Sequence, residues 1–340
     1  MKKILLTCPS TNIHGGIRII FEWANGLARL GHDVTLQIWQ TGKLNFWVEI
    51  DPKVKIVQST VMPQHGFDII VATTPALANH LQNTGTYAKK FYLLQMNEVL
   101  FHPGNRRYVD EVRRSYKVDF PIIGISKWVE EEVRMVRGDK KMYYVGNGVS
   151  DDFCIGKKDE GLTVLVEGWG GYPGNVNQAK DVSMLAPRVA EVLKKEYGAK
   201  IIAFSQFPLN KLEHVAKYNY ILDEYHEAPY GADLVRLYQR PTFMLKASVY
   251  DARSCAPVEA MKCGTVTVRA IERGDDDLIH EYNCLRCKYN YAELLHIARQ
   301  FMEMSEEQRR SLVNTGLYYA ANALDWVSNI AKIEKILLNG

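Results

Sequence analysis

Short runs of β-branched and other apolar residues alternate along the chain with longer segments in which apolar residues recur at helical spacing. This alternation is typical of parallel strands that are joined by crossover helices. The predicted strands of the first half are residues 2–8, 32–39, 67–74, 91–96 and 120–126, and those of the second half are residues 162–168, 199–205, 241–248 and 264–270. Because the pattern occurs twice, the sequence predicts an α/β chain of two doubly wound domains rather than one large sheet.

A turn and a polar stretch separate the two sets of strands. Residues 146–148, with the sequence GNG, mark the turn, and the polar residues 154–161 resemble a linker. We therefore predict a first domain of residues 1–155 and a second domain of residues 156–320.

The final segment, residues 305–340, has an apolar stripe at helical spacing. It is too long for a single compact helix. A broken helix, whose last part at residues 321–340 crosses back to the first domain, would explain this length.

Composition and charge narrow the class of protein. Of the 340 residues, 47% are hydrophobic and 24% are charged, as is typical of a globular chain. The formal net charge of +3 is spread along the sequence, so a nucleic-acid partner is neither indicated nor excluded. No apolar run approaches the ~20 residues of a membrane-spanning helix, and the apolar stretch at the start is shorter than the roughly 7–15 residues of a signal peptide. We expect a soluble, cytoplasmic protein, at most peripheral to a membrane.

The cysteines and histidines do not form a metal-binding pattern. The six cysteines are scattered, so we expect them to be reduced. Cys284 and Cys287 form a lone CxxC, and none of the nine histidines completes a zinc spacing around it. We therefore expect no bound metal.

A glycine pair, Gly15 and Gly16, lies between the first predicted strand and the helix that follows it. Glycines let backbone amides approach a ligand closely, and the start of a helix favours negative charge. The alternative is a tight strand-to-helix turn without a ligand. The stretch is no GxGxxG fingerprint and contains no Walker lysine, so both interpretations stay open.

The stretch DARSCAPVEAM, residues 251–261, carries two acids. Asp251 follows a predicted strand, and Pro257 suits the first turn of a helix that runs through Met261. Asp251 is then expected beyond the carboxyl end of the strand, where open α/β sheets bind ligands, and Glu259 is expected to face the same crevice from the first turn. Alternatively, Glu259 caps its own helix through the free amides of that turn.

These two acids, followed by CGTVTV, resemble the EX7E motif of retaining glycosyltransferase family 4. Asp251 occupies the first position of the motif and Glu259 the second. The resemblance spans nearly the whole chain, because it extends to the glycine pair with LARLGHDV, to ISKWVEEEV at 125–133, to VGNGVSDDF at 145–153 and to residues 227–248. It implies the GT-B fold, in which two Rossmann-like domains face each other across a cleft.

The resemblance also implies a reaction. A sugar moves from a nucleotide-diphosphate donor to the hydroxyl of a glycan, a lipid-linked or another acceptor, with retention of configuration and without a metal or other cofactor. Asp251 would address the transferred sugar, and Glu259 would hold the ribose. The further residues that the resemblance implies at the donor are Gly15 and Gly16 from the first domain and the amides of Arg253, Ser254, Cys255 and Ala256.

The chain departs from the family pattern in two places. Asp251 stands where the family usually has glutamate, so its reach to the sugar is shorter. The arginine that the family places on the donor phosphates is replaced by Trp169, although Lys180 can stand for the family's lysine. Arg253 would then supply the missing charge from the other loop. The alternative for Lys180 is an ordinary solvated helix lysine.

Polar residues follow the predicted strand at 91–96. Gln95, Asn97 and Glu98 are similar to the QxxE segment of rhamnosyltransferase-like family members, and the nearest histidine is His102. We predict that Asn97 and Glu98 act in catalysis through contacts with the acceptor or the sugar. The alternative is that they are polar groups of a loop.

The segment at 105–117 predicts an amphipathic helix with a basic face. Arg106, Arg107, Arg113 and Arg114 on this face would suit a membrane surface, a phosphorylated acceptor or nucleic acid. A solvated face of a packed helix is the alternative, and Asp110 within the basic face favours it.

Two other functions remain open from the sequence. A non-catalytic nucleotide-sugar-binding partner subunit would explain Asp251 and the missing arginine. A sugar-nucleotide epimerase of similar architecture would convert the donor with no acceptor present.

Overall fold

The computed structural model divides the chain into two compact units. It describes residues 1–138, 141–169, 180–322 and 325–340. Residues 1–147 and 326–340 form the first unit, and residues 148–325 form the second. The boundaries that we predict from the sequence are 155 and 320. Each unit is described by itself below.

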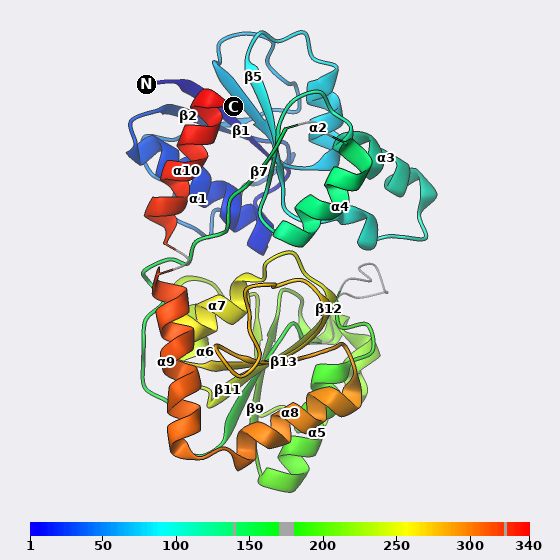
Figure 1. Cartoon of the computed structure of the whole chain (residues 1–340), viewed down its shortest axis with the longest axis vertical. Coiled ribbons are helices and arrows are strands. Elements are labelled where there is room, and N and C mark those ends of the chain that lie inside the picture. Colours follow the sequence, from blue (N-terminus) through cyan, green and yellow to red (C-terminus); the bar gives the residue numbers. More distant parts are fainter. Residues whose placement is uncertain (139–140, 170–179, 323–324) are drawn as a thin grey trace. The chain divides into compact units, whose positions relative to one another are not determined.

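The first unit is built on a parallel sheet with the order β3-β2-β1-β4-β5-β6-β7 among the described residues (Figure 1). Its strands are Lys3–Cys8 (β1), Asp33–Ile38 (β2), Lys55–Gln58 (β3), Ile69–Ala72 (β4), Lys89–Leu94 (β5), Ile122–Gly124 (β6) and Met142–Tyr144 (β7). Its helices are Gly15–Arg29 (α1), Pro75–Gln82 (α2), Arg106–Tyr116 (α3), Lys127–Arg137 (α4) and Trp326–Asn339 (α10), with a 3-10 turn at Glu98–Leu100 (η1).

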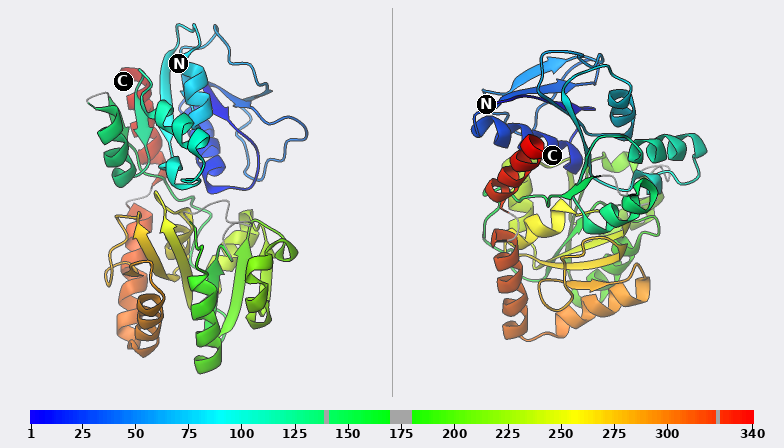
Figure 2. Two further views of the ribbon diagram at one scale, coloured as in Figure 1. Left: turned by 90° about the vertical axis from the view of Figure 1, so that its right-hand side faces the viewer. Right: turned by 45° about the horizontal axis from the view of Figure 1, so that its top comes forward.

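The second unit has a parallel sheet with the order β10-β9-β8-β11-β12-β13 among the described residues, and Figure 2 shows it from the side. Its strands are Thr163–Glu167 (β8), Lys200–Ser205 (β9), Glu224–Glu227 (β10), Phe243–Tyr250 (β11), Val266–Arg273 (β12) and Leu285–Cys287 (β13). Its helices are Leu185–Tyr197 (α5), Gly231–Gln239 (α6), Cys255–Lys262 (α7), Tyr291–Glu303 (α8) and Glu306–Asn322 (α9), with 3-10 helices at Leu209–Lys211 (η3) and Glu213–Ile221 (η4).

Apolar side chains cover both faces of the second sheet. Val164 and Val166 of β8 pack into one cluster with residues of α5 and α8. Leu165, between them, packs into another cluster with residues of α6 and α7. Because successive residues of a strand point to opposite faces, a strand of this sheet must be apolar on both sides, as the sequence pattern indicates.

The structure confirms each strand that the sequence predicts and adds four strands at the sheet edges. These are β3 and β7 in the first sheet and β10 and β13 in the second. They are short and poorly buried, and β3 is exposed along its whole length. An edge strand is not buried on both faces, so it lacks the apolar run by which the other strands are recognised.

The C-terminal segment forms two helices, which belong to different units. Helix α9 lies in the second unit, and α10 packs against α1 of the first unit. The contact is close because a Cβ atom at Gly26 of α1 would lie 2.5 Å from the Cγ1 atom of Ile330. His32 Nε2 also lies 2.8 Å from a carboxylate oxygen of Glu334. The last helix is therefore a structural part of the first unit.

The strand order of the second sheet marks one place where ligands are expected to bind. In the second sheet β8 and β11 are neighbours. The strands after β8 in the sequence, β9 and β10, are added on one side of this pair, and the strands after β11 are added on the other side. Doubly wound sheets bind ligands beyond the carboxyl ends of the strands at this point. Residues that directly follow Glu167 of β8 and Tyr250 of β11 are thus the first candidates for a site.

Candidate functional site

Asp251 directly follows β11 at the predicted position. Its backbone amide donates to the carbonyl of Arg273 at the end of β12, with an N···O distance of 3.2 Å. Gly274, with a φ of 126°, lies against it, and a Cβ atom at this glycine would lie 1.7 Å from the carbonyl oxygen of Asp251. Any side chain at position 274 would therefore collide with the backbone of Asp251.

The Gly274→Ala variant should displace this loop. A side chain at this position meets rigid backbone as well as an unfavourable φ, so the variant should unfold at a lower temperature and lose donor binding. Gly161→Ala is the matched control, because Gly161 also has a positive φ of 76° but open space around it. It should lose only the roughly 1–2 kcal/mol of a left-handed residue. Equal thermal midpoints for the two variants would contradict the predicted clash.

Cations surround the carboxylate of Asp251. Its oxygens lie 3.3 Å from Nζ of Lys180, 3.1 Å from Nη2 of Arg269 and 3.9 Å from Nζ of Lys246. The Asp251 side chain is 13% exposed and that of Lys180 is 29% exposed. Burial disfavours the charged acid, but the three cations outweigh burial and hold the pKa of Asp251 well below its usual range. Asp251 is thus an ionised acid that reaches the surface next to an accessible lysine.

Two of these cations form a charged row on the sheet. Lys246 of β11 and Arg269 of β12 are paired in register, and their side chains are 4% and 0% exposed. Like charges that lie opposite each other on neighbouring strands repel. Glu167 at the end of β8 pairs with Lys246, and Asp275 pairs with Arg269 at 2.5 Å, so an acid of a further strand and an acid of a loop offset the repulsion.

Helix α7 begins earlier than the sequence indicates. Its first residue is Cys255, and Ser254 is the N-cap. The backbone amide of Ser254 donates to Oδ1 of the buried Asp275 at 2.6 Å. This amide therefore has a partner inside the protein, and its contact with the sugar stays a prediction. Ala256 is also buried, while Cys255 is partly exposed.

The early helix start also changes the position of Glu259. Because α7 begins at Cys255, Glu259 lies in the second turn and not in the first turn that we predict from the sequence. The residue is only 6% exposed and faces Tyr238 of α6. Burial and then the negative charge of Glu259 raise the pKa of Tyr238 well above its usual value. Glu259 thus faces the packed side of α7, away from solvent.

Arg253 turns away from Asp251 and toward α9. Its Nη2 atom lies 2.6 Å from a carboxylate oxygen of Asp277 and 2.7 Å from the hydroxyl of Tyr319. The guanidinium is almost buried by these contacts. From the sequence we expect Arg253 to replace the missing phosphate arginine, whereas the structure gives it a contact that ties the 251–254 loop to α9.

Trp169 is a core residue of the second unit. It is fully buried, and its indole Nε1–H donates to Oδ1 of Asn219 at 3.1 Å. The residues that follow it, 170–179, lie outside the part of the chain that the structure describes. Tryptophan therefore fills packing space where the family resemblance leads us to expect a phosphate-binding arginine.

The start of α5, beside the end of β8, is capped by an acid of the chain. The carboxylate of Asp181 accepts hydrogen bonds from the amides of Leu185 and Ala186 at 2.8 and 3.0 Å and from the hydroxyl of Tyr289 at 2.7 Å. Amides at a helix start are a common place for a phosphate. Here Asp181 already occupies them, which leaves Lys180 as the neighbouring group for an anion.

The glycine pair begins α1 in the first unit. Nδ1 of His14 accepts from the amide of Gly16 at 3.3 Å, and the side-chain amide of Gln95 donates to the carbonyl of Gly16 at 3.1 Å. A Cβ atom at Gly16 would lie 2.8 Å from Oε1 of Gln95. Glycine at 16 therefore lets Gln95 approach the helix start, a reason that the sequence alone did not reveal. Gly15, the first residue of α1, is exposed.

Asn97 and Glu98 follow β5 and are held by helices α3 and α4. Asn97 donates to Glu132 at 2.6 Å and accepts from the hydroxyl of Tyr116 at 2.9 Å. The hydroxyl of Tyr108 donates to Glu98 at 3.1 Å. Burial raises the pKa of Glu98 from 4.5 to about 7. These two residues are thus fixed members of a hydrogen-bonded cluster, in which one acid titrates near neutral pH.

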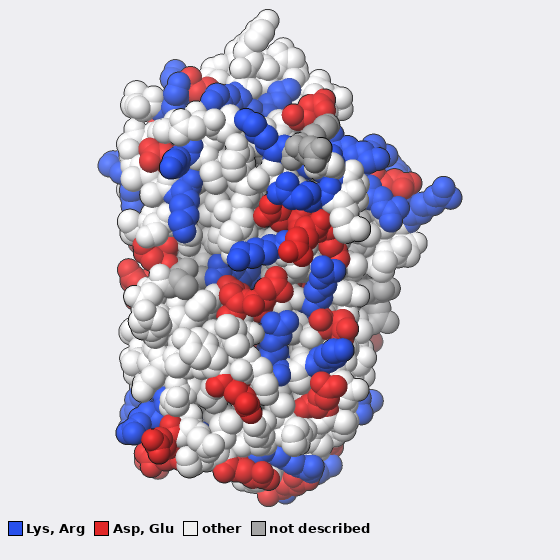
Figure 3. Space-filling view, viewed as in Figure 1, with Lys and Arg blue, Asp and Glu red and all other residues white. Residues whose placement is uncertain are grey.

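The basic face of α3 is exposed as the sequence predicts. Arg106, Arg107, Arg113 and Arg114 lie on the surface, and Figure 3 shows Lys and Arg side chains gathered over this helix. Asp110 is exposed within the same face. Val109 and Val112 are buried on the opposite face, so α3 is amphipathic. The choice among a membrane, a phosphorylated acceptor, nucleic acid and plain solvation stays a prediction.

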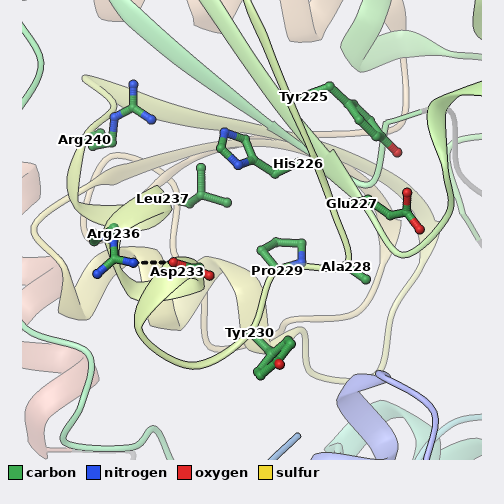
Figure 4. A pocket seen from close by; sticks show the side chains of 10 residues that line it. All are labelled: Tyr225, His226, Glu227, Ala228, Pro229, Tyr230, Asp233, Arg236, Leu237 and Arg240. Atoms are coloured by element: carbon green, nitrogen blue, oxygen red, sulfur yellow. Dashed lines mark hydrogen bonds and ion pairs between the residues drawn. The ribbon is translucent and has the colours of Figure 1, made fainter.

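A pocket of about 420 Å³ lies at the edge of the second sheet, between β10 and α6 (Figure 4). Both arginines that line it have carboxylate partners. Arg240 pairs with Glu224 at 2.7 Å, and Arg236 pairs with Asp233 on the same helix. These two cations are therefore already engaged within the chain.

Membrane-spanning helices and metal sites are both absent from the described residues. Among them, no helix is both long and apolar enough to cross a membrane. The same described part of the chain holds no group of three or more His, Cys, Asp or Glu side chains that is placed to bind a metal ion.

The sequence does not lead us to predict the charged residues that lie around Asp251. These are Glu167, Lys246, Arg269 and Asp275. A signal was present, because FMLKAS and VTVRA each place a basic residue inside an otherwise apolar predicted strand. A charge in the interior of a strand that is covered on both faces must be paired.

Comparison with known proteins shows the fold. No protein-family model matches the sequence, and no curated protein matches it. Sucrose-phosphate synthase from Thermosynechococcus elongatus is 13% identical with a TM-score of 0.82, over 99% of this chain and 98% of that chain. Anabaena HepE in complex with UDP-glucose is 13% identical with a TM-score of 0.77, over all of both chains. WaaG, a glycosyltransferase involved in lipopolysaccharide biosynthesis, is 13% identical with a TM-score of 0.74, over 99% of this chain and 100% of that chain. The chain therefore has the GT-B fold, with two Rossmann-like domains along one polypeptide.

Proposed function

We propose that this protein is a glycosyltransferase, which moves a sugar from a nucleotide-diphosphate sugar to an acceptor hydroxyl with retention of configuration and without a metal. The GT-B fold supports the class of enzyme. The observation that carries the proposal is the ionised Asp251 beside the accessible Lys180, beyond the carboxyl end of β11. One acid for sugar hydroxyls next to one cation for phosphate is the minimum that such a donor needs.

Asp251 and Lys180 bind different parts of the proposed donor. The carboxylate of Asp251 accepts hydrogen bonds from the transferred sugar, and the ammonium of Lys180 pairs with the diphosphate. The start of α7 adds its positive dipole end near the same place. Since Glu259 is buried against Tyr238, the proposed site rests on Asp251 and Lys180 and does not require a ribose contact from Glu259.

The proposed chemistry needs no protein nucleophile. The bond from the anomeric carbon to the diphosphate oxygen breaks, and the bond to the acceptor oxygen forms on the same face of the sugar. The proton of the acceptor hydroxyl passes to the departing diphosphate. Positive charge from Lys180 stabilises the negative charge that develops on the diphosphate in the transition state.

Glu98 and Asn97 are proposed to contact the acceptor or the sugar from the first unit. If the ionised form of Glu98 binds a hydroxyl, kcat/KM should fall as the pH is lowered through about 7, where this acid takes a proton. The Glu98→Gln variant should be less active at pH 8 and should lose this inflection. It should also be more stable at high pH than the parent, because a raised pKa means that ionisation of Glu98 destabilises the folded state. An unchanged inflection in the variant would rule out this role for Glu98.

The experiment that tests the proposed function is a donor panel. The purified chain is incubated with UDP-, GDP- and ADP-sugars, with and without hydroxyl acceptors, and free nucleotide diphosphate is measured. UDP-glucose comes first, because HepE was solved with it. Acceptor-dependent release with retained configuration supports the proposal. Binding without turnover by any pair favours the non-catalytic partner subunit, and conversion of the donor sugar without an acceptor favours the epimerase.

A further inference from the structure

The carboxylate of Asp251 has cations on two sides that differ in access to solvent. Lys180 is 29% exposed, whereas Lys246 and Arg269 are buried behind Asp251 within the unit. We propose that Lys246 and Arg269 are positioning residues, which keep Asp251 ionised and in one orientation when Lys180 moves to the donor diphosphate. This inference rests on the proposed donor site.

A single cation beside Asp251 would not keep this acid charged after the donor binds. If Lys180 were the only cation beside Asp251, its transfer to a diphosphate would leave a largely buried carboxylate without compensation. Such an acid takes a proton instead of staying charged, and it then accepts sugar hydroxyls less well. Counter-ions that stay in place after the donor binds remove this conflict.

Lys246 and Arg269 are each held by an acid, so they do not move toward the donor when it binds. Lys246 is fixed by Glu167, the last residue of β8, and Arg269 is fixed at 2.5 Å by Asp275, in the loop after β12. Asp275 also accepts from the amide of Ser254 at 2.6 Å, so the same network orders the loop between Asp251 and α7. Lys180 has greater side-chain exposure than the two cations behind Asp251, and this exposure makes it the cation that a ligand can reach.

The buried cations Lys246 and Arg269 also bear on the missing arginine, whose place in the family pattern is taken by Trp169. The family resemblance places a phosphate-binding arginine where Trp169 is packed in the core. In this chain Lys180 can supply the positive charge to the diphosphate, because Lys246 and Arg269, neighbours in the register of β11 and β12, stay with Asp251. Arg253, which is bound to Asp277 and Tyr319, is not needed for this purpose.

The test measures binding of a nucleoside diphosphate and of its sugar derivative, starting with UDP and UDP-glucose and using the best pair from the donor panel. In the parent, the preference for the sugar derivative should change with pH only as the terminal phosphate of the free nucleoside diphosphate titrates near about pH 6, a change that every variant shares. In Lys246→Met, the preference relative to that of the parent should fall about tenfold between about pH 8 and about pH 5, since one unit of pKa corresponds to a factor of ten. At each pH, the affinity of this variant for the nucleoside diphosphate alone should differ from that of the parent by less than about twofold. Lys246→Arg keeps the charge and should restore the preference of the parent.

A double-mutant cycle with Asp251→Asn separates this role from a general structural one. If Lys246 acts through Asp251, then Lys246→Met should cause no further loss of preference, and no further pH dependence, in the Asp251→Asn background. An equal loss in both backgrounds, or an equal loss for the nucleoside diphosphate and its sugar derivative, would overturn the inference. Thermal unfolding of each variant shows whether the fold is retained. A parent protein that binds no nucleoside diphosphate would refute the proposed function and this inference with it. Normal binding by the parent, with the same pH dependence of the preference in Lys246→Met as in the parent, would refute the inference alone.

Discussion

Asp251→Asn should transfer sugar about a hundred- to a thousandfold more slowly than the parent. The substitution keeps the shape of the side chain but removes the negative charge that the proposed site presents to the sugar hydroxyls. Loss of one preorganised polar group in an active site typically has an effect of this size on kcat. The measurement is the initial rate of acceptor-dependent nucleotide release, with the donor that the parent uses.

Two control variants show whether the loss of activity in Asp251→Asn is specific to the charge at this position. Asp251→Glu keeps the charge and should retain more activity than Asp251→Asn, although its longer side chain changes the reach. Asp151→Asn removes an exposed acid that pairs with Lys262 in the same unit, and its rate should equal that of the parent. Parent-like transfer by Asp251→Asn would show that this acid does not contact the reacting sugar.

Arg269→Met should have the largest effect on stability. It removes a fully buried cation and leaves Asp275 and Asp251 with less compensation in the interior. Removal of one partner from a buried ion pair costs about 3–5 kcal/mol. In a unit of this size, each kcal/mol lowers the thermal midpoint by roughly 2–4 °C, so we expect a decrease of about 10 °C.

The loss in Arg269→Met should depend on pH with a defined sign. Burial already raises the pKa of Asp275, and this pKa should rise further without the guanidinium of Arg269, so the folded variant binds more protons than the unfolded chain. The variant should therefore regain stability as the pH falls and lose stability as the pH rises. Arg269→Lys keeps a charge and should lose less at pH 8. A thermal midpoint for Arg269→Met that equals the parent's would contradict the proposed network.

The sequence predicts the central strands of both sheets, since their residues are apolar on both faces. It does not predict β3 or β10, because an edge strand packs on one side only and its side chains are largely polar or exposed. The repeated pattern of strands and helices predicts two doubly wound domains, whereas the GT-B architecture is predicted from the family resemblance. The edges of the sheets depend on contacts that no short stretch of sequence encodes.

The position of Asp251 is predictable because it follows a recognisable strand. Its surroundings are not. Lys246 lies between Leu245 and Ala247, a pattern that fits a side chain pointing to solvent, but α6 and α7 cover that face of the sheet. The start of α7 is equally hidden, because the amide of Ser254 is held by Asp275, far along the chain. Long-range contacts of this kind decide where Glu259 lies.

The central claim is that Asp251 and Lys180 form the donor site. A crystal structure of the intact chain with its best nucleotide sugar from the donor panel tests it most directly. We predict sugar hydroxyls on the Asp251 carboxylate, the diphosphate on Lys180, and Lys246 and Arg269 still in contact with Asp251. A nucleotide sugar bound elsewhere in the chain, such as the pocket between β10 and α6, with the Lys180–Asp251 pair intact, would contradict it.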